Sequence, residues 1–236
     1  MTDPVQIQRD YYSRTAEEYD SGHAEREHIV AGHLLAAFIK LNNIRSVLDV
    51  GAGTGRAMRF LQEHCPDVSV KGIEPVSELR EIAYCNGISE EDLVEGCGLY
   101  IPFPDNSFDL VCEFAVLQHV MRQQDLVAEM YRVERMVVAL SDENFMGQGK
   151  LPVRLVKTVL FQVGLWPVVN WIKTRGKGYT ISEEDGLAYS YSVYQNLPQL
   201  KAAWRRVNVI SVSATHDGVL GVRMSAPHVF AIGLDQ

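Results

Sequence analysis

The stretch Val47-Leu-Asp-Val-Gly51-Ala-Gly53-Thr-Gly55-Arg56 decides the fold. A short apolar run, Ser46–Val50, passes directly into three alternating glycines, and a helical pattern follows from Arg56. An unbroken apolar run of this length is typical of a buried parallel strand. Glycine adopts positive φ and lets a ligand approach the backbone closely. We therefore predict a strand, a tight turn and a helix whose first N–H groups face a bound ligand.

Strand-like and helix-like segments alternate on both sides of this turn. Apolar runs at residues 69–74, 109–114 and 135–140 predict strands, and amphipathic stretches at residues 24–41, 56–64, 77–85 and 124–133 predict helices. The alternation predicts βαβ units around a parallel sheet. Residues 207–213 and 228–234 predict two final strands, and the turn residues between them favour a hairpin with an antiparallel last strand.

The length of the chain is compatible with one domain, residues 1–236. Within this domain, residues 1–42 are predicted to be an N-terminal helical lid region. Residues 150–206 interrupt the alternation with an aromatic-rich segment. We predict that this segment is a mostly helical insertion, which lies over the carboxyl edge of the sheet and caps a substrate pocket.

Composition and charge narrow the function classes. The chain has 22 Lys and Arg against 30 Asp and Glu, and its net charge of −8 disfavours a large nucleic-acid footprint. A basic cluster of Lys173, Arg175 and Lys177 is interpreted as a solvated loop. The longest apolar stretch, residues 159–172, is interrupted by polar residues, and the first ten residues lack a signal core. We therefore expect a cytoplasmic protein without membrane attachment.

Neither a metal site nor a disulfide framework is expected. The four cysteines form no CxxC pair. His23, His28 and His33 recur every five residues, a spacing that spreads them around a helix. Nothing in the sequence specifies an oligomeric state.

Two acidic residues flank the glycines. Asp49 lies two residues before Gly51, where a carboxylate disfavours a pyrophosphate and favours a cationic amine. Glu74 ends the next strand, 23 residues beyond Gly51, where an acidic residue can accept hydrogen bonds from both hydroxyls of a ribose. The spacing GxGxG also differs from the GxGxxG of dinucleotide-binding folds. Together these residues predict a ligand that carries a ribose and an ammonium group.

Several segments resemble the class I S-adenosylmethionine-dependent methyltransferases, over nearly the whole chain. Tyr11–Asp20 is similar to the N-terminal lid segment of this family, Val47–Gly55 to its first motif and Gly72–Pro75 to its second. Ile101–Asp109 and Leu117–Val120 resemble the residues around its fourth strand. The resemblance implies a Rossmann-like α/β fold, with a mostly parallel seven-stranded sheet, helices on both faces and an antiparallel last strand. It also implies S-adenosylmethionine as the cofactor and S-adenosylhomocysteine as its product.

The resemblance further implies a set of cofactor-binding residues. They are Tyr12, Tyr19, Asp49, Gly51, Ala52, Gly53, Gly55, Glu74, Pro75, Cys97, Gly98, Phe114 and Ala115. Tyr12 and Tyr19 would close over the cofactor or anchor the first helix by hydrophobic packing. Cys97 occupies the place where the family usually carries an acidic residue that reaches the adenine amino group. Glu95 or a backbone carbonyl would then supply that contact.

His119 and Asp142 are the candidate catalytic residues. His119 follows the fourth strand near the carboxyl edge, where ligands bind in open α/β sheets, and a histidine titrates in the range that suits a general base. A structural role at a helix start is the alternative. Asp142 follows the fifth strand at the same edge and could act as a base or form a turn.

Side chains with hydroxyl and amide groups are candidates for substrate binding. They are Asn144, Tyr189 and Tyr191. The two tyrosines follow Ser182 and Asp185, a pair that could also contact substrate or cap a helix start. His216 and Asp217 could reach the site from the final hairpin or form a turn.

The leading hypothesis is transfer of a methyl group to a small molecule, at a hydroxyl of a sugar-like compound or natural product. N- or C-methylation of a small molecule, methylation of a macromolecule, and a non-catalytic S-adenosylmethionine-binding partner protein are the alternatives. The acidic charge disfavours a nucleic-acid substrate. So does Glu113-Phe-Ala-Val, which stands where an Asn/Asp-Pro-Pro-aromatic run would be expected.

Overall fold

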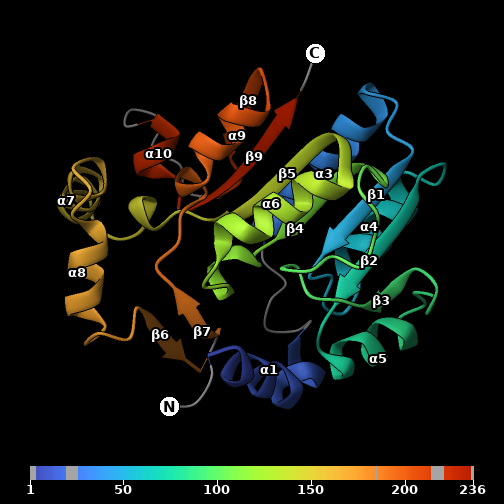
Figure 1. The fold of residues 1–236 in the computed structure, drawn as a ribbon, viewed down its shortest axis with the longest axis horizontal. Helices are drawn as coiled ribbons and strands as arrows, with labels where there is room; N and C mark the ends of the chain where they lie inside the picture. Colours follow the sequence, from blue (N-terminus) through green and yellow to red (C-terminus); the bar gives the residue numbers. More distant parts are fainter. Residues whose placement is uncertain (1–3, 20–25, 184, 214–220, 235–236) are drawn as a thin grey trace.

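A seven-stranded sheet forms the centre of the computed structural model, which describes residues 4–19, 26–183, 185–213 and 221–234 (Figure 1). Its strand order is β3-β2-β1-β4-β5-β9-β8. The strands are β1 (Ser46–Val50), β2 (Ser69–Glu74), β3 (Leu93–Glu95), β4 (Phe108–Phe114), β5 (Glu134–Glu143), β8 (Arg206–Ser211) and β9 (His228–Leu234). The first five run parallel, and β9 pairs antiparallel with both β5 and β8. The predicted sheet, including its antiparallel last strand, is confirmed.

Alternating residues of the strands fill a core on each face of the sheet, because the side chains of a strand point alternately to its two faces. Val47 and Leu110 pack on one face with α3 (Arg26–Leu41), α4 (Arg56–His64) and α5 (Ser77–Cys85). Leu48 and Val111 pack on the other face with α6 (Gln123–Val133) and α9 (Leu197–Ala203). Helix α6 crosses in front of β4 and β5 in Figure 1. The helices therefore cover both faces, as predicted.

Strand β5 extends beyond its predicted end. The sequence predicts a strand over residues 135–140 and leaves Asp142 after it, as a base or in a turn, whereas β5 continues to Glu143. The additional residues pair with His228–Phe230 of β9, which supplies hydrogen-bond partners for their backbone groups. The alternative of a turn at Asp142 is therefore excluded, because this residue lies buried within the strand.

The insertion combines helices with a β-hairpin. It contains α7 (Leu151–Gln162), α8 (Trp166–Lys173), the antiparallel pair β6 (Tyr179–Ser182) and β7 (Gly186–Tyr189), η4 (Val193–Gln195) and α9. The prediction of a mostly helical segment is thus wrong for residues 179–189. The backbone N–H of Asp185 donates to Ser182 Oγ at 3.0 Å, so the pair closes a hairpin turn and does not cap a helix. Gly186 completes that turn with a positive φ of 66°.

The N-terminal helices lie against the hairpin and the sheet edge. Helix α1 (Pro4–Thr15) contacts β7 and α5, and η1 (Ala16–Glu18) follows it (Figure 1). The backbone N–H of Leu187 in β7 donates to Gln8 Oε1, which joins the lid region to the insertion. None of the helices in the described residues is long and apolar enough to cross a membrane.

Gly147 provides a test of how tightly the polypeptide packs behind the sheet edge. It ends η3 (Phe145–Gly147), and a Cβ at this position would lie 2.1 Å from the backbone oxygen of Ala226. Backbone cannot move aside as a side-chain tip can, so we predict that Gly147→Ala lowers the free energy of unfolding by about 2–3 kcal/mol. Urea denaturation measures the loss, with Gln148→Ala as the neighbouring control. A change below about 0.5 kcal/mol would contradict the packing described.

Candidate functional site

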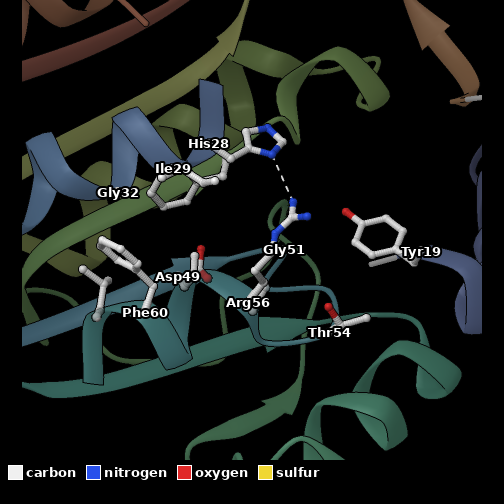
Figure 2. Close-up of a pocket in the computed structure, with 13 residues that line it drawn as sticks. Tyr19, His28, Ile29, Gly32, Asp49, Gly51, Thr54, Arg56 and Phe60 are labelled. Carbon is white, nitrogen blue, oxygen red and sulfur yellow. Dashed lines mark hydrogen bonds between the residues drawn. The ribbon is translucent and has the colours of Figure 1, made fainter. Parts of the chain in front are cut away.

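Two adjoining cavities open at the carboxyl ends of β1, β2 and β4. The larger, about 400 Å³, lies among α1, α5 and η2 (Leu117–His119). The smaller, about 140 Å³, lies beside Asp49 and α3 (Figure 2). Tyr19, Gly51 and Phe114 line both cavities, so the two form one elongated site. This is the edge at which open α/β sheets bind ligands.

The glycine turn forms the floor between the two cavities. Gly51, Gly53 and Gly55 have φ values of 75°, 56° and 73°, in the left-handed region that disfavours other residues. The N–H groups of Gly51 and Ala52 both donate to the Ile73 carbonyl, at 2.9 and 3.0 Å, which ties the turn to β2. A Cβ on Gly51 would lie 2.6 Å from Val116. Gly51 and Gly53, which line the cavities, therefore present bare backbone to a ligand.

Glu74 presents its carboxylate to the larger cavity from the end of β2. Its two oxygens accept hydrogen bonds from the N–H groups of Gly53 (3.0 Å) and Val76 (2.9 Å). The side chain is buried, and this burial raises the pKa of Glu74 to about 7, although the two N–H donors act in the opposite direction. Each carboxylate oxygen keeps a second acceptor site. Glu74 can therefore accept two more hydrogen bonds from a pair of hydroxyls.

Asp49 is a buried carboxylate with an unsatisfied oxygen. Its side chain lines the smaller cavity, and Oδ2 accepts no hydrogen bond from the described residues. Burial and repulsion from Glu74 raise the pKa of Asp49 to about 7, against the opposing influence of Arg56. A buried carboxylate oxygen without a hydrogen-bond donor lowers the stability of the protein, unless a ligand supplies the donor. Its chemistry fits an ammonium group.

Arg56 and His28 are site residues that the sequence analysis did not identify. The Arg56 guanidinium lies below the His28 ring in Figure 2, and its Nη2 is 3.0 Å from His28 Nδ1. Both residues line the smaller cavity. Arg56 directly follows the glycine turn, which could have marked it as a ligand contact. His28 had no such signal, because only the packing of α3 on α4 brings it there. Arg56 thus adds a positive charge to the wall of the cavity that Asp49 also lines.

Twelve of the thirteen proposed cofactor-binding residues line one of the cavities. Gly55 does not. A Cβ there would lie 2.8 Å from Ile88, so its glycine serves helix–loop packing. Cys97 and Gly98 line the larger cavity, whereas Glu95 does not and its carboxylate instead pairs with Arg80 at 3.3 Å. Ala115 has a φ of 57°, a strained backbone conformation at the cavity edge.

An aromatic cluster covers the larger cavity. The ring of Tyr12 meets those of Tyr19 and His119 edge to face, with centroids 5.7 and 5.8 Å apart. All three residues line the cavity. Tyr12 and Tyr19 also pack on Val76 and Leu79 beside α5. Aromatic faces attract cations, so the cluster suits a ligand with a positive centre as well as an apolar one.

His119 is fixed by the lid and the hairpin. Its Nδ1 lies 2.8 Å from the Leu187 carbonyl oxygen and 3.0 Å from the Gln8 amide nitrogen. A carbonyl oxygen only accepts, so Nδ1 carries a proton that it donates to Leu187. The other nitrogen, Nε2, is 3.3 Å from the Gln118 amide. In the neutral ring Nε2 is therefore the atom with a lone pair.

The other candidate residues separate into two groups. Tyr189 lines the larger cavity. Asp142, Asn144 and Tyr191 line neither cavity, and each is fully buried in the described structure. Asp142 Oδ2 accepts from the N–H of Leu117 at 2.8 Å, so this carboxylate supports the η2 turn that carries His119.

Asn144 and Tyr191 are held in closed hydrogen-bond sets. Asn144 donates to the carbonyls of Arg223 and Ala226, both at 2.8 Å, and accepts from Ser192 Oγ. The Tyr191 hydroxyl donates to Asn196 Oδ1 at 2.8 Å. These contacts give both residues structural partners in place of a substrate.

Glu113 is a further buried acid that the sequence analysis did not place. Its carboxylate accepts from the N–H groups of Ser141 (3.0 Å) and Val116 (2.9 Å), and burial together with Asp142 raises its pKa well above the usual range. Among the described residues no group of three or more His, Cys, Asp or Glu side chains could hold a metal ion. His23, His216 and Asp217 lie outside the described residues.

Known proteins share both sequence and fold with this chain. Residues 48–136 match a family model described as a methyltransferase domain. An uncharacterised methyltransferase of Schizosaccharomyces pombe is 30% identical over 136 residues, which is 53% of this chain and 47% of that protein. The demethylmenaquinone methyltransferase of Deinococcus radiodurans is 37% identical over 93 residues, 38% of each chain. The chain thus spans less than half the length of these curated relatives.

The solved structures agree in fold. A Thermotoga maritima S-adenosylmethionine-dependent methyltransferase, described as a possible histamine N-methyltransferase, matches with a TM-score of 0.60 at 16% identity. The match covers 96% of this chain and 99% of that one. The comparisons thus show a methyltransferase domain over residues 48–136 and, for the chain as a whole, the fold of S-adenosylmethionine-dependent methyltransferases. Its site fits that cofactor, because Asp49 offers an unsatisfied oxygen, Glu74 two free acceptor sites and the glycines an open floor.

The raised pKa values make cofactor binding depend on pH. Asp49 and Glu74 both have a pKa of about 7 in the free protein, and each must be ionised to bind an ammonium or a ribose most strongly. Protonation below pH 7 therefore competes with the ligand. We predict that affinity for S-adenosylhomocysteine falls by up to about tenfold per pH unit per carboxylate between pH 7 and pH 5, and levels off above pH 8.

Isothermal titration calorimetry across this pH range measures the dependence. The variant Cys97→Ala, altered in the same cavity but with both carboxylates intact, should keep the slope. A constant affinity from pH 5 to pH 8 would show that neither carboxylate titrates against the ligand.

Proposed function

We propose that the protein transfers a methyl group from S-adenosylmethionine to a hydroxyl of a small, mainly apolar acceptor. The observation that carries the proposal is the ring of His119, fixed in the larger cavity with Nδ1–H on the Leu187 carbonyl and Nε2 as its only lone-pair nitrogen. Such a ring can take a proton from a hydroxyl. An acceptor that needs no proton removal would not require this arrangement.

The two cavities divide the cofactor between them. The larger cavity would hold the adenosine, with Glu74 accepting from the ribose hydroxyls and Cys97 and Gly98 beside the base. The smaller cavity would hold the amino acid end, with Asp49 accepting from the ammonium and Arg56 near the carboxylate. Tyr19, Gly51 and Phe114, shared by both cavities, would lie at the centre of the bound molecule.

The acceptor would lie in the part of the larger cavity beneath α1. The lining there includes Val5, Tyr12, Val116, Val120 and Tyr189, with His119 among them, and its other polar members are Gln8, Arg9 and Arg122. The sequence analysis favoured a sugar-like compound or natural product, with Asn144, Tyr189 and Tyr191 as candidate contacts; of these, Asn144 and Tyr191 line neither cavity. Those two side chains are satisfied elsewhere. A mainly apolar molecule with a single hydroxyl therefore suits this part better than a polyhydroxylated sugar does.

The transfer is an in-line displacement that this chain would assist by positioning and by proton removal. When bound, S-adenosylmethionine supplies a methyl carbon activated by its sulfonium. That methyl group would pass to the acceptor oxygen, and the cofactor would leave as S-adenosylhomocysteine. His119 Nε2 takes the hydroxyl proton, while the Leu187 carbonyl accepts from Nδ1–H and holds the ring in place.

Gln118 is suited to follow this change of charge. In one orientation its amide nitrogen faces His119 Nε2 at 3.3 Å, which matches the neutral ring. In the reversed orientation the nitrogen lies 3.2 and 3.3 Å from the Glu143 carboxylate, and the amide oxygen faces Nε2. That orientation matches a protonated ring, because the oxygen can then accept from Nε2–H.

The acceptor class can be tested with labelled S-adenosylmethionine and three probes: a hydroquinone with a short alkyl chain, a catechol and a monosaccharide. The hydroquinone is included because one relative is named for demethylmenaquinone. We expect methylation at oxygen of an apolar phenol and none of the sugar. Methylation of the sugar alone, or at ring carbon, would contradict the proposed acceptor chemistry.

His119→Asn should separate proton removal from cofactor binding. We predict that kcat falls by about 10²–10⁴-fold and that the decrease is smaller for a substrate already ionised at the assay pH, because such a substrate has no proton to lose. Affinity for S-adenosylhomocysteine should stay within about threefold of wild type. His33→Asn, on the exposed side of α3, is the matched control. An unchanged kcat would leave His119 with a purely structural role.

A further inference from the structure

Helices α7 and α8 carry an uncovered apolar surface. Only Thr158 in α7 and Trp166 in α8 are buried. Ten of the eighteen exposed large hydrophobic residues in the described chain lie between residues 151 and 172. The six most exposed of them, at 55–65%, are Val156, Val159, Val163, Val168, Trp171 and Ile172, which we call the outer apolar face. Exposed hydrophobic residues gathered in this way mark an interaction site.

The orientation of this face is fixed by packing on the other side of the helices. Trp166 stacks on Phe145 of η3 with ring centroids 4.4 Å apart, and Leu160, Phe161 and Val169 pack on the same small core. The two helices lie at the left edge of the molecule in Figure 1, apart from the seven-stranded sheet. The inner side is thus occupied by the protein's own core, and the outer face points away from it.

The charge of the surrounding segment is opposite to that of the whole chain. Residues 144–182 contain six Lys and Arg and no Asp or Glu, in a chain with a formal net charge of −8. Lys150, Lys173, Arg175 and Lys177 are exposed at the ends of the two helices. The last three form the cluster that the sequence analysis interpreted as a solvated loop. A basic rim around an apolar face is complementary to a surface that combines an apolar layer with negative charge.

We propose that the outer apolar face and its basic rim bind the surface of a membrane that contains anionic lipids. Amphipathic helices with aliphatic and Trp side chains on one face and Lys or Arg around it insert into the interface of such membranes. Tryptophan favours the head-group level, and each basic residue near the surface is attracted by the anionic lipids. The attachment would be peripheral, which differs from the sequence expectation of no membrane attachment.

A second copy of the chain is a poorer complement to this face. Pairing of two outer apolar faces about a twofold axis would bring two basic rims together. The remaining exposed large hydrophobic residues of the described chain are distributed over separate elements, for example Leu41, Tyr100, Met136 and Ile210. They offer no second apolar surface of similar extent. A bilayer provides both the apolar layer and the negative charge.

Tryptophan fluorescence gives a direct readout on the full chain. Trp171 is 61% exposed, whereas Trp166 and Trp204 are 6% and 5% exposed, so a blue shift on binding reports chiefly on Trp171. Vesicles of phosphatidylcholine and phosphatidylglycerol in a three-to-one ratio should shift the emission and co-sediment with the protein. Vesicles of phosphatidylcholine alone should bind at least about tenfold more weakly. No methyl donor or acceptor is present, so the result is independent of the proposed function.

Two variants and two matched controls test the surface itself. Val156→Ser/Val159→Ser/Val168→Ser should weaken co-sedimentation at least tenfold, and Lys173→Glu/Lys177→Glu should weaken it about tenfold on the anionic vesicles only. Leu41→Ser/Met136→Ser/Ile210→Ser and Lys40→Glu/Lys201→Glu change exposed residues elsewhere and should bind as wild type does. Circular dichroism and S-adenosylhomocysteine binding confirm that each variant is folded.

The proposal is overturned if the full chain binds neither kind of vesicle, or if the α7–α8 variants bind as tightly as their controls. A third result would also overturn it: the wild-type chain does not bind the vesicles, and sedimentation shows that it is a dimer which the triple valine variant converts to monomer. That last result would assign the face to contact between copies of the chain.

Discussion

Two buried carboxylates at the ends of neighbouring strands govern the site. Asp49 and Glu74 lie at the carboxyl ends of β1 and β2, repel each other and have little contact with water, so each resists ionisation. The glycine turn holds them in place, since its N–H groups bond to Ile73 and to Glu74 itself. A ligand with a cationic amine and a pair of hydroxyls would offset both the repulsion between the two carboxylates and the loss of their hydration. The free-energy cost of burying the carboxylates therefore favours a ligand of this chemistry over others.

The same site depends on two segments that lie far from it in the sequence. Gln8 of α1 and Leu187 of β7 meet at His119, and these contacts link the lid region, the hairpin and the turn after β4. Asp142 supports that turn from below through the Leu117 and Gln118 N–H groups. A polar network of this kind specifies one arrangement when all of its members are satisfied. The part of the site around His119 is therefore built by tertiary contacts, whereas the part around Asp49 is built mainly by one strand–turn–helix unit.

This division explains what the sequence could predict. The ranges of β1, β2, α4, α5 and β9 follow from local apolar patterns and glycines, and the structure has them at the same residues. Asp49 and Glu74 were identifiable because their distance from Gly51 along the chain fixes their place at the strand ends. The hairpin at residues 179–189 and the extension of β5 depend on pairing with other strands. Local sequence patterns do not contain this information, so they did not predict either feature. The burial of Asn144 and Tyr191 likewise follows from contacts with residues 192–226. The approach of His28 to Arg56 follows from the packing of α3 on α4.

We propose that Asp49 recognises the ammonium group of the cofactor. The most direct test compares wild type and Asp49→Asn with two ligands, S-adenosylhomocysteine and 5′-methylthioadenosine, of which only the first carries the amino acid. The account predicts that the substitution weakens S-adenosylhomocysteine by about tenfold or more and leaves 5′-methylthioadenosine nearly unchanged. An equal loss for both ligands would mean that Asp49 supports the turn as a whole, and it would contradict the assignment.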